Sequence, residues 1–346
     1  MAPLQFKPMN TKIGCRVETE LIFRGWRMVV LENKNLRVSI LPEKGSDIIE
    51  FRYKPLDLDI MWESPLGLRS KEWFVATNGG GAQGNFLDYY EGGWQEILPN
   101  AGPASEYKGA SIGQHGEVSL SPWNCQVLED NGQRVSVKMS VETHRTPFRL
   151  EKILTLEKDA PTLFLEEAVT NLSAEKMEFL WGHHPAFGAP FLSGSCRLEI
   201  PGNPDVEILA GDGASHTNIL PGKGKWPIVS GKKGPVDLRE VPSFKNKVSN
   251  MFFLTNLPEG RYQIKNPEKK LSFRMEWDLK VFSHLWYWQV AGGSFNYPWW
   301  GRTYNIALEP FSGPPTIARA VKEGNALSLK AGKSLKTSLA ASFLTL

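Results

Sequence analysis

Two segments contain histidines that could act in acid–base catalysis, because the imidazole gains and loses a proton near neutral pH. His184 precedes Pro185, which favours an extended backbone and points the imidazole away from the strand direction. His183 should then face the opposite side of the strand, where we expect a structural role. His115 stands just before Gly116, where the backbone can turn tightly and present a ring from a loop. Taken singly, each histidine fits an ordinary core or turn position as well as a catalytic one.

Glu309 is the carboxylate placed most suggestively. It follows the apolar run Ile306 to Leu308 and precedes Pro310, so it should lie near the end of a strand at the level of a sheet. Such a glutamate is either a surface charge or a partly desolvated acid or base, since glutamate is rarely buried without a partner or a function. The residues alone leave both interpretations open.

Other common chemistries lack their motifs. The histidines and Glu309 do not follow metal-ligand spacings such as His-x-His or Glu-x-x-His, so we expect no catalytic metal. No Gly-x-Ser-x-Gly nucleophile motif occurs. The glycines at 79–81 are not followed by the Gly-Lys-Ser/Thr of a phosphate loop. We therefore expect a protein that works without a cofactor.

The elements that would position these residues are predominantly strands. Apolar and polar residues alternate over 36–40, 135–141, 271–277 and 335–343, as in strands with one buried face. The 32 glycines and 24 prolines indicate many short strands joined by turns. The best helix candidate runs from Pro315 to Gly324, and 211–234 resembles a long loop. We predict an all-β fold, a large antiparallel β-sandwich with few short helices, forming a single domain over 1–346.

Composition excludes several classes of protein. The net charge of +3 comes from 40 basic and 37 acidic residues spread along the chain, which argues against nucleic acid as a partner. No segment is apolar over the roughly 18 residues that a membrane helix needs, so no membrane association is expected. Residues 1–20 lack the apolar stretch of a secretory signal, and three scattered cysteines suggest reduced thiols. A cytoplasmic location is expected.

Taken together, several segments resemble the aldose 1-epimerase (galactose mutarotase-like) family, in a divergent branch. The resemblance spans nearly the whole chain and rests on the order and spacing of motifs that are individually common. These are Asn35–Pro42 with Gly45, Gly93-Trp94-Gln95-Glu96, Pro99-Asn100-Ala101-Gly102, His115-Gly116, Asn171-Leu172-Ser173, His184-Pro185 with Phe187, Leu308-Glu309-Pro310, and Leu329–Gly332. The chain departs from the family where Ala186-Phe187-Gly188 replaces the usual Tyr-Phe-Asn, and it lacks the Asn-Arg segment before the first histidine.

The resemblance implies a fold and a reaction. It implies two twisted antiparallel sheets with a sugar site on a concave face, and interconversion of the α and β anomers of a free sugar. By the same implication, Glu309 is the base, His184 the acid, and His115 a residue that orients the substrate. Acid and base exchange roles between ring opening and closure, so one pair serves both steps without a cofactor.

The expected partner is a small-molecule sugar, bound by a monomer or homodimer. Trp94, Trp286 and Trp288 are candidates for stacking on the sugar ring, and Asn100, Gln289 and Arg302 for contacting hydroxyls or an acidic substituent. Three alternatives remain open. They are a non-catalytic carbohydrate-binding protein, a sugar-phosphate epimerase, and a glycosidase or lyase with Glu96 or Glu117 as the second carboxylate.

Overall fold

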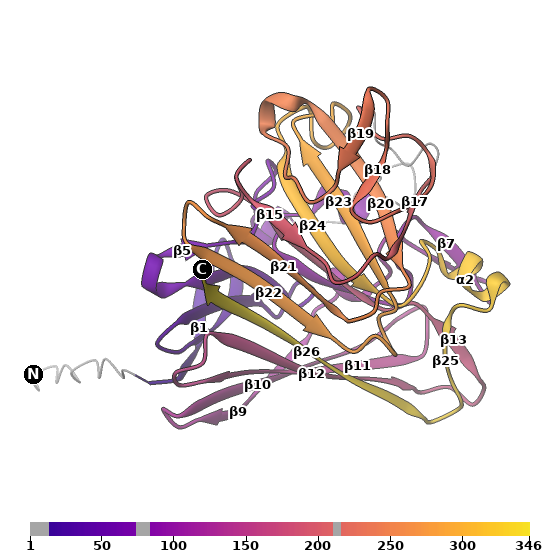
Figure 1. Ribbon diagram of the computed structural model, residues 1–346. Coiled ribbons are helices and arrows are strands. Elements are labelled where there is room, and N and C mark those ends of the chain that lie inside the picture. Colours follow the sequence, from indigo (N-terminus) through magenta and orange to yellow (C-terminus); the bar gives the residue numbers. More distant parts are fainter. Residues whose placement is uncertain (1–13, 74–83, 210–215) are drawn as a thin grey trace, which may run out of the picture.

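A computed structural model of the protein describes residues 14–73, 84–209 and 216–346. Two large antiparallel sheets form most of it (Figure 1). The first sheet has twelve strands, in the spatial order β1-β2-β3-β4-β6-β14-β24-β23-β20-β16-β17, with β5 paired to β4. Its strands are β1 (Arg16–Phe23), β2 (Trp26–Glu32), β3 (Leu36–Leu41), β4 (Asp47–Tyr53), β5 (Leu58–Asp59), β6 (Trp94–Ile97), β14 (Gly182–Phe187), β16 (Asp205–Ile208), β17 (Gly222–Lys225), β20 (Val248–Thr255), β23 (His284–Ala291) and β24 (Tyr304–Phe311).

The second sheet has eight strands, in the order β15-β21-β22-β26-β12-β11-β10-β9. They are β9 (Asn124–Asp130), β10 (Arg134–Glu142), β11 (Phe148–Glu157), β12 (Thr162–Asn171), β15 (Arg197–Glu199), β21 (Arg261–Asn266), β22 (Leu271–Trp277) and β26 (Ser334–Thr345). Three strand pairs stand apart: β7 (Ser105–Tyr107) with β8 (Ala110–Ile112), β13 (Met177–Phe179) with β25 (Leu327–Leu329), and β18 (Ile228–Gly231) with β19 (Gly234–Asp237).

Helices are short. The described part of the chain holds the α-helices α1 (Gly84–Asp88) and α2 (Ile317–Glu323), with 3₁₀ turns at Lys54–Leu56, Lys71–Trp73, Val118–Leu120 and Phe244–Asn246. The prediction of a large antiparallel β-sandwich with few helices is confirmed. None of these helices is long and apolar enough to cross a membrane.

Local sequence signals account for most of these elements. The four segments with alternating residues lie in β3, β10, β22 and β26, as predicted. The predicted helix is α2, where the side chain of Thr316 caps the first turn by accepting from the Arg319 amide, and Gly324 ends the helix with a φ of 73°.

The prediction of a long loop over 211–234 is wrong for its described part. Residues 222–225 form β17 and 228–231 form β18. Neither strand shows the alternation that reveals a half-buried strand, since β17 reads Gly-Lys-Gly-Lys and is mostly exposed. Residues 211–215 of the predicted loop lie outside the described residues.

The two sheets pack face to face through aromatic side chains. Phe51 of β4 stacks on Phe343 of β26, with ring centroids 5.4 Å apart. Phe187 of β14 meets Phe273 of β22 at 5.0 Å. These contacts place one face of β14 inside the sandwich. The opposite face of the same strand is therefore directed away from the second sheet.

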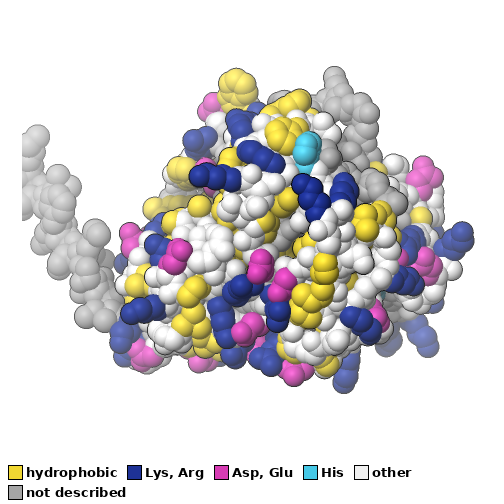
Figure 2. All heavy atoms as spheres, turned by 45° about the horizontal axis from the view of Figure 1, so that its top comes forward, with side chains coloured by type: hydrophobic (Ala, Val, Ile, Leu, Met, Phe, Trp, Pro, Cys, Tyr) yellow, Lys and Arg dark blue, Asp and Glu magenta, His cyan; other side chains and the backbone are white. Residues whose placement is uncertain are grey.

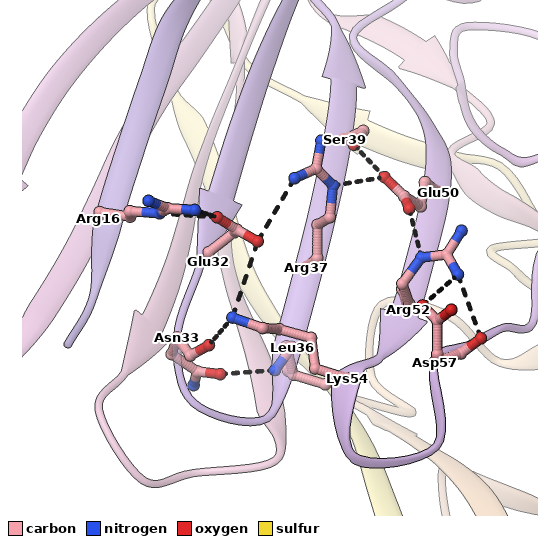
Figure 3. A network of polar contacts seen from close by, with 10 residues as sticks. All are labelled: Arg16, Glu32, Asn33, Leu36, Arg37, Ser39, Glu50, Arg52, Lys54 and Asp57. Atoms are coloured by element: carbon pink, nitrogen blue, oxygen red, sulfur yellow. Dashed lines mark hydrogen bonds and ion pairs between the residues drawn. The ribbon is translucent and has the colours of Figure 1, made fainter. Parts of the chain in front are cut away.

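Polar side chains form a network on the face of β2, β3 and β4 that points away from the second sheet (Figure 3). The guanidinium of Arg37 lies between two carboxylates, 3.4 Å from Glu32 and 3.0 Å from Glu50. Arg52 continues the network to Glu50 at 2.6 Å and to Asp57 at 2.8 Å. Because the alternate residues of β3 are buried and Arg37 is partly exposed, this ladder lies on the outer side of the sheet. Charged side chains of both signs are also interspersed over the face of the molecule shown in Figure 2.

Candidate active site

His184 and Glu309 face each other on neighbouring strands. Gly182 pairs with Phe311 and Ala186 with Ala307, so the register of β14 and β24 sets His184 opposite Glu309. The Nε2 of His184 lies 3.5 Å from the Oε1 of Glu309, and both side chains are almost fully buried. The structure thus brings together the two residues expected to be acid and base.

Burial favours the uncharged form of both groups. It lowers the pKa of His184 to about 3, with a smaller contribution from His115. It also raises the pKa of Glu309 well above its usual value. The neutral ring of His184 therefore keeps one N–H, and burial shifts Glu309 towards its protonated form. Glu309 Oε1 has no hydrogen-bond partner among the described residues, so it can accept a bond from a bound hydroxyl.

Tyr90 holds the other side of the His184 ring. Its hydroxyl lies 3.2 Å from His184 Nδ1. Burial, together with the charges of Glu309, Glu91 and Asp47, raises the pKa of Tyr90 well above 10, so the phenol keeps its proton. A phenol that donates to Nδ1 leaves the histidine proton on Nε2, which faces Glu309.

His115 reaches the same site from a tight turn. Its own backbone is left-handed, with a φ of 58°, an uncommon conformation for a residue with a side chain. Its Nδ1 is bonded to the carbonyl oxygen of Ala101, which can only accept, so Nδ1 carries the proton and Nε2 is left as an acceptor. The rings of His115 and His184 lie 5.2 Å apart. Burial lowers the pKa of His115 to about 4, so its ring is neutral at neutral pH.

These residues share a pocket of about 490 Å³, a size typical of small-molecule sites. Aromatic and other apolar side chains dominate its lining, and no lysine or arginine is among the described residues that line it. The lining consists of Phe86, Leu87, Tyr90, Gly102, Pro103, Gln114, His115, His184, Ser249, Asn250, Met251, Phe253, Trp286, Trp288, Ser294, Trp299, Glu309 and Pro315.

His183 faces the interior of the sandwich, as the alternation of β14 predicts. Its Nε2 lies 3.0 Å from Glu167 of β12, and its Nδ1 accepts a hydrogen bond from the indole of Trp94. Glu96 lies beside this pair and faces the ammonium of Lys152 at 3.2 Å. Glu96, Glu167 and His183 are close enough to share a metal ion. However, both ring nitrogens of His183 are already engaged and Lys152 supplies a cation, so these contacts fit an internal ionic cluster better.

The predicted sugar contacts divide into two groups. Trp286 and Trp288 line the pocket, with Trp286 packed on Phe311 at 4.1 Å. Trp94 lies on the His183 side of the sheet and is 2% exposed, so its position does not support stacking on a ligand in this pocket. Arg302 is exposed and does not line the pocket.

Asn100 and Gln289 support the pocket from behind. The Asn100 amide donates to the carbonyls of Gly102, Pro103 and Gly113, and its Oδ1 accepts from the Ile317 amide at the start of α2. Gln289 accepts from Asn250, which lines the pocket, and donates to Tyr287. Their positions indicate that they hold pocket segments in place, which differs from the direct hydroxyl contacts predicted for them.

Neither candidate for a second carboxylate reaches the pocket. Glu96 accepts from the Trp181 indole on the interior side of β6. Glu117 accepts from the backbone amides of His144 and Arg145 at a loop. Among the described lining residues, Glu309 is therefore the only one with a carboxylate. This arrangement does not support a hydrolase, which needs two carboxylates flanking the bond.

Sequence reasoning missed several lining residues. Tyr90 precedes the Glu91-Gly92-Gly93 turn, and the position of an aromatic residue beside a glycine-rich turn could have identified it as a pocket residue. Trp299, within Pro298-Trp299-Trp300, carried a similar signal. Phe86, in the five-residue helix α1, carried none, because a helix this short has no readable periodicity.

The family of the chain follows from its sequence. A family model described as a domain of unknown function, DUF4432, matches residues 23–342, which include every residue of the pocket. The chain belongs to the DUF4432 family. No curated protein sequence matches this DUF4432 chain.

Many solved structures match this chain, and the three described next are distant from it in sequence. A protein described as a candidate aldose 1-epimerase from Klebsiella pneumoniae is 12% identical with a TM-score of 0.73, over 96% of this chain and 83% of that one. The Slr1438 protein from Synechocystis is 18% identical with a TM-score of 0.64, over all of both chains. A galactose mutarotase-like protein from Clostridium acetobutylicum is 14% identical with a TM-score of 0.63, over 96% of this chain and 99% of that one. At these identities the likeness shows that the DUF4432 chain has a galactose mutarotase-like sandwich fold.

Proposed function

We propose that this DUF4432 protein is an aldose 1-epimerase that interconverts the α and β anomers of a free sugar. The observation that carries the proposal is the buried pair of His184 and Glu309, 3.5 Å apart in an aromatic pocket. The structural neighbours described as aldose 1-epimerase and mutarotase-like proteins support the same reaction class on this scaffold.

In the proposed reaction Glu309, as carboxylate, removes the proton of the anomeric hydroxyl. The bond between C1 and the ring oxygen breaks, and His184, as imidazolium, delivers its Nε2 proton to that oxygen and becomes neutral imidazole. The open aldehyde rotates about C1–C2, and the ring closes on the other face with the two roles reversed. Closure returns Glu309 to the carboxylate and His184 to the imidazolium, so the protons balance over one turnover.

The reacting form of the site is an ion pair of the Glu309 carboxylate and the His184 imidazolium. Burial disfavours this form in the empty pocket, and the hydroxyls of a bound sugar stabilise it by replacing the lost solvation. An anomeric hydroxyl that donates to Glu309 Oε1 supplies such a contact, because that oxygen lacks a partner. His115 Nε2 is placed to accept from another hydroxyl, which fits the orienting role implied for it.

The pocket lining favours an uncharged sugar. A sugar phosphate needs lysine or arginine to bind its charge, and none is found among the described lining residues. The flat faces of Trp286 and Trp288 suit the apolar faces of a sugar ring. A sugar-phosphate epimerase is therefore less well supported than a mutarotase.

The test is exchange NMR on a panel of free aldoses, neutral and acidic, with wild-type protein and Glu309→Gln. Faster exchange between the α and β anomeric protons with wild type, and not with the variant, is the expected result. Line broadening of a sugar without faster exchange would contradict the proposal and favour a non-catalytic carbohydrate-binding protein.

A further inference from the structure

The loop between β23 and β24 carries aromatic side chains that the proposed reaction does not use. Ser294 and Trp299 of this loop line the pocket, and Trp299 packs against Trp288 with ring centroids 5.6 Å apart. Three further aromatic residues on the same loop are open to solvent. Phe295 is 43% exposed, Tyr297 46% and Trp300 58%. We call these three residues the rim aromatics.

The loop is held in a defined shape. The Gly292 amide donates to the Thr303 carbonyl at 2.8 Å, and the Gly301 amide to Ser294 at 2.6 Å. Gly301 has a φ of 72°, and a Cβ there would meet the ring of Phe295 at 2.9 Å, so the ring packs directly on this glycine. The rim aromatics thus belong to a turn closed by several backbone contacts.

A second contact ties the loop to the other side of the pocket. The hydroxyl of Tyr297 donates to the carboxylate of Asp88, the last residue of α1. Phe86 and Leu87 of α1 line the pocket, as do Ser294 and Trp299 of the loop. The Tyr297–Asp88 bond therefore joins two lining segments and fixes the rim aromatics beside the pocket.

Exposed aromatic groups beside a binding pocket usually mark a contact surface, because leaving them in water is unfavourable. Three side chains on one loop are too small an area for a stable protein interface, which needs about 1,000 Å² or more. Aromatic faces do match the apolar faces of pyranose rings, and the loop that carries the rim aromatics also supplies Ser294 and Trp299 to the pocket lining.

We propose that the substrate is the reducing end of an oligosaccharide. The reducing residue occupies the pocket and the next residue lies on the rim aromatics. This inference rests on the proposed anomer exchange and names its substrate class. The chemistry is unchanged, because exchange involves only C1, its hydroxyl and the ring oxygen of the terminal residue. A glycosidic bond at a hydroxyl away from C1 leaves those atoms free.

The experiment compares monosaccharides with disaccharides that end in the same reducing sugar. Suitable pairs are glucose with cellobiose and with maltose, xylose with xylobiose, and mannose with mannobiose. We expect kcat/KM for anomer exchange to be about tenfold or more higher for at least one disaccharide than for its monosaccharide. Trp300→Ala should remove most of that preference and leave the monosaccharide rate unchanged. Phe23→Ala is the matched control, since Phe23 is 46% exposed on the edge strand β1 and does not line the pocket.

The outcomes separate the two proposals. Exchange of monosaccharides at rates equal to or above those of every disaccharide would overturn the oligosaccharide inference and leave the mutarotase proposal standing. A Trp300→Ala variant that slows both members of a pair equally would also overturn it. No acceleration for any sugar would overturn the mutarotase proposal, and this inference with it.

Discussion

At the scale of single residues, the site depends on how burial and hydrogen bonds set the protons of a few side chains. Glu309 and His184 face each other at 3.5 Å, Tyr90 bonds the far side of the His184 ring, and His115 offers an acceptor nitrogen. Sequence reasoning predicted Glu309, His184 and His115 through motif order, and the structure brings all three to one pocket. Their catalytic roles remain proposals, which the following substitutions test.

Glu309→Gln and His184→Asn should each lower the rate of anomer exchange by about 10²–10⁴-fold, the usual contribution of a general acid or base. The fold should persist, because each substitute is similar in size and polar. Exchange NMR measures the rate and circular dichroism the fold. His284→Asn, at a histidine on β23 outside the pocket lining, should retain the wild-type rate. Near-wild-type turnover in either site variant would disprove the assigned mechanism.

The pH dependence of activity should reflect the lowered pKa of His184. The reacting form carries one titratable proton, on His184, so activity is lost when a second proton binds as the pH falls. With the pKa of His184 at about 3, kcat/KM should decline on the acid side only below about pH 5. Steady-state measurements from neutral pH downwards give this acid limb. An acid limb with a midpoint near 6.5, the ordinary value for imidazole, would contradict this description of the site.

Tyr90→Phe removes the hydroxyl that faces His184 Nδ1. We expect kcat to fall about tenfold, the equivalent of one neutral hydrogen bond, because the ring then loses its tautomer preference. The pH profile should also shift, which a purely structural role would not cause. Tyr107→Phe is the matched control, since its hydroxyl bonds Glu178 away from the pocket at 2.6 Å. Equal effects of the two substitutions would argue against a positioning role for Tyr90.

At the scale of elements, strand alternation separates two histidines that are neighbours in sequence. On β14, His184 faces the pocket and His183 faces Glu167 of the second sheet. A turn, and not a strand, brings the third histidine to the pocket. The residues from Gly113 to Gly116 reverse the chain so that the ring of His115 meets the pocket, with two consecutive left-handed residues at His115 and Gly116.

Gly116→Ala should disturb this turn. Gly116 has a φ of 76°, and a Cβ would lie 2.1 Å from the Leu98 carbonyl oxygen, so the backbone must move. We expect a loss of kcat/KM of about 10–100-fold through displacement of His115, with reduced thermal stability. Gly109→Ala provides the comparison, because its φ is 83° but nothing lies within 4 Å of the added carbon. It should lower stability by only about 1 kcal/mol and keep activity. Unchanged activity in Gly116→Ala would show that the His115 turn is dispensable.

At the scale of the whole molecule, the sandwich encloses charges as well as apolar groups. Lys44 contacts Asp47 at 2.7 Å and Glu91 at 2.6 Å, and all three are almost fully buried. Lys152 links this cluster to the one around His183, since its ammonium donates to the Ser46 carbonyl and faces Glu96. Burial raises the pKa of Glu91 to about 8, so part of the negative charge is removed by protonation.

Lys44→Met should destabilise the protein by about 3–5 kcal/mol, because it leaves buried carboxylates without their cation. Chemical denaturation at pH 7 measures the free energy of unfolding. Lys71→Met is the control, since Lys71 pairs with Glu43 at 2.7 Å while 45% exposed, and its loss should cost less than about 1 kcal/mol. Similar losses for the two variants would mean that the interior cluster contributes no more than a surface pair.

Much of this protein could be predicted from sequence because the signals are local. Alternation revealed β3, β10, β22 and β26, and a cap residue with a terminal glycine revealed α2. Motif order also singled out Glu309, His184 and His115. A single domain over 1–346, a monomeric or homodimeric state and a cytoplasmic location stay predictions.

Tertiary structure decided which side chains meet. Trp94, Asn100 and Gln289 have residue types that suit sugar binding, yet the register and facing of their segments direct them to other partners. Tyr90 and Trp299 reach the pocket from segments with little periodicity of their own. The physical reason is that a strand's alternation defines two faces, whereas only the pairing of distant strands decides what each face contacts.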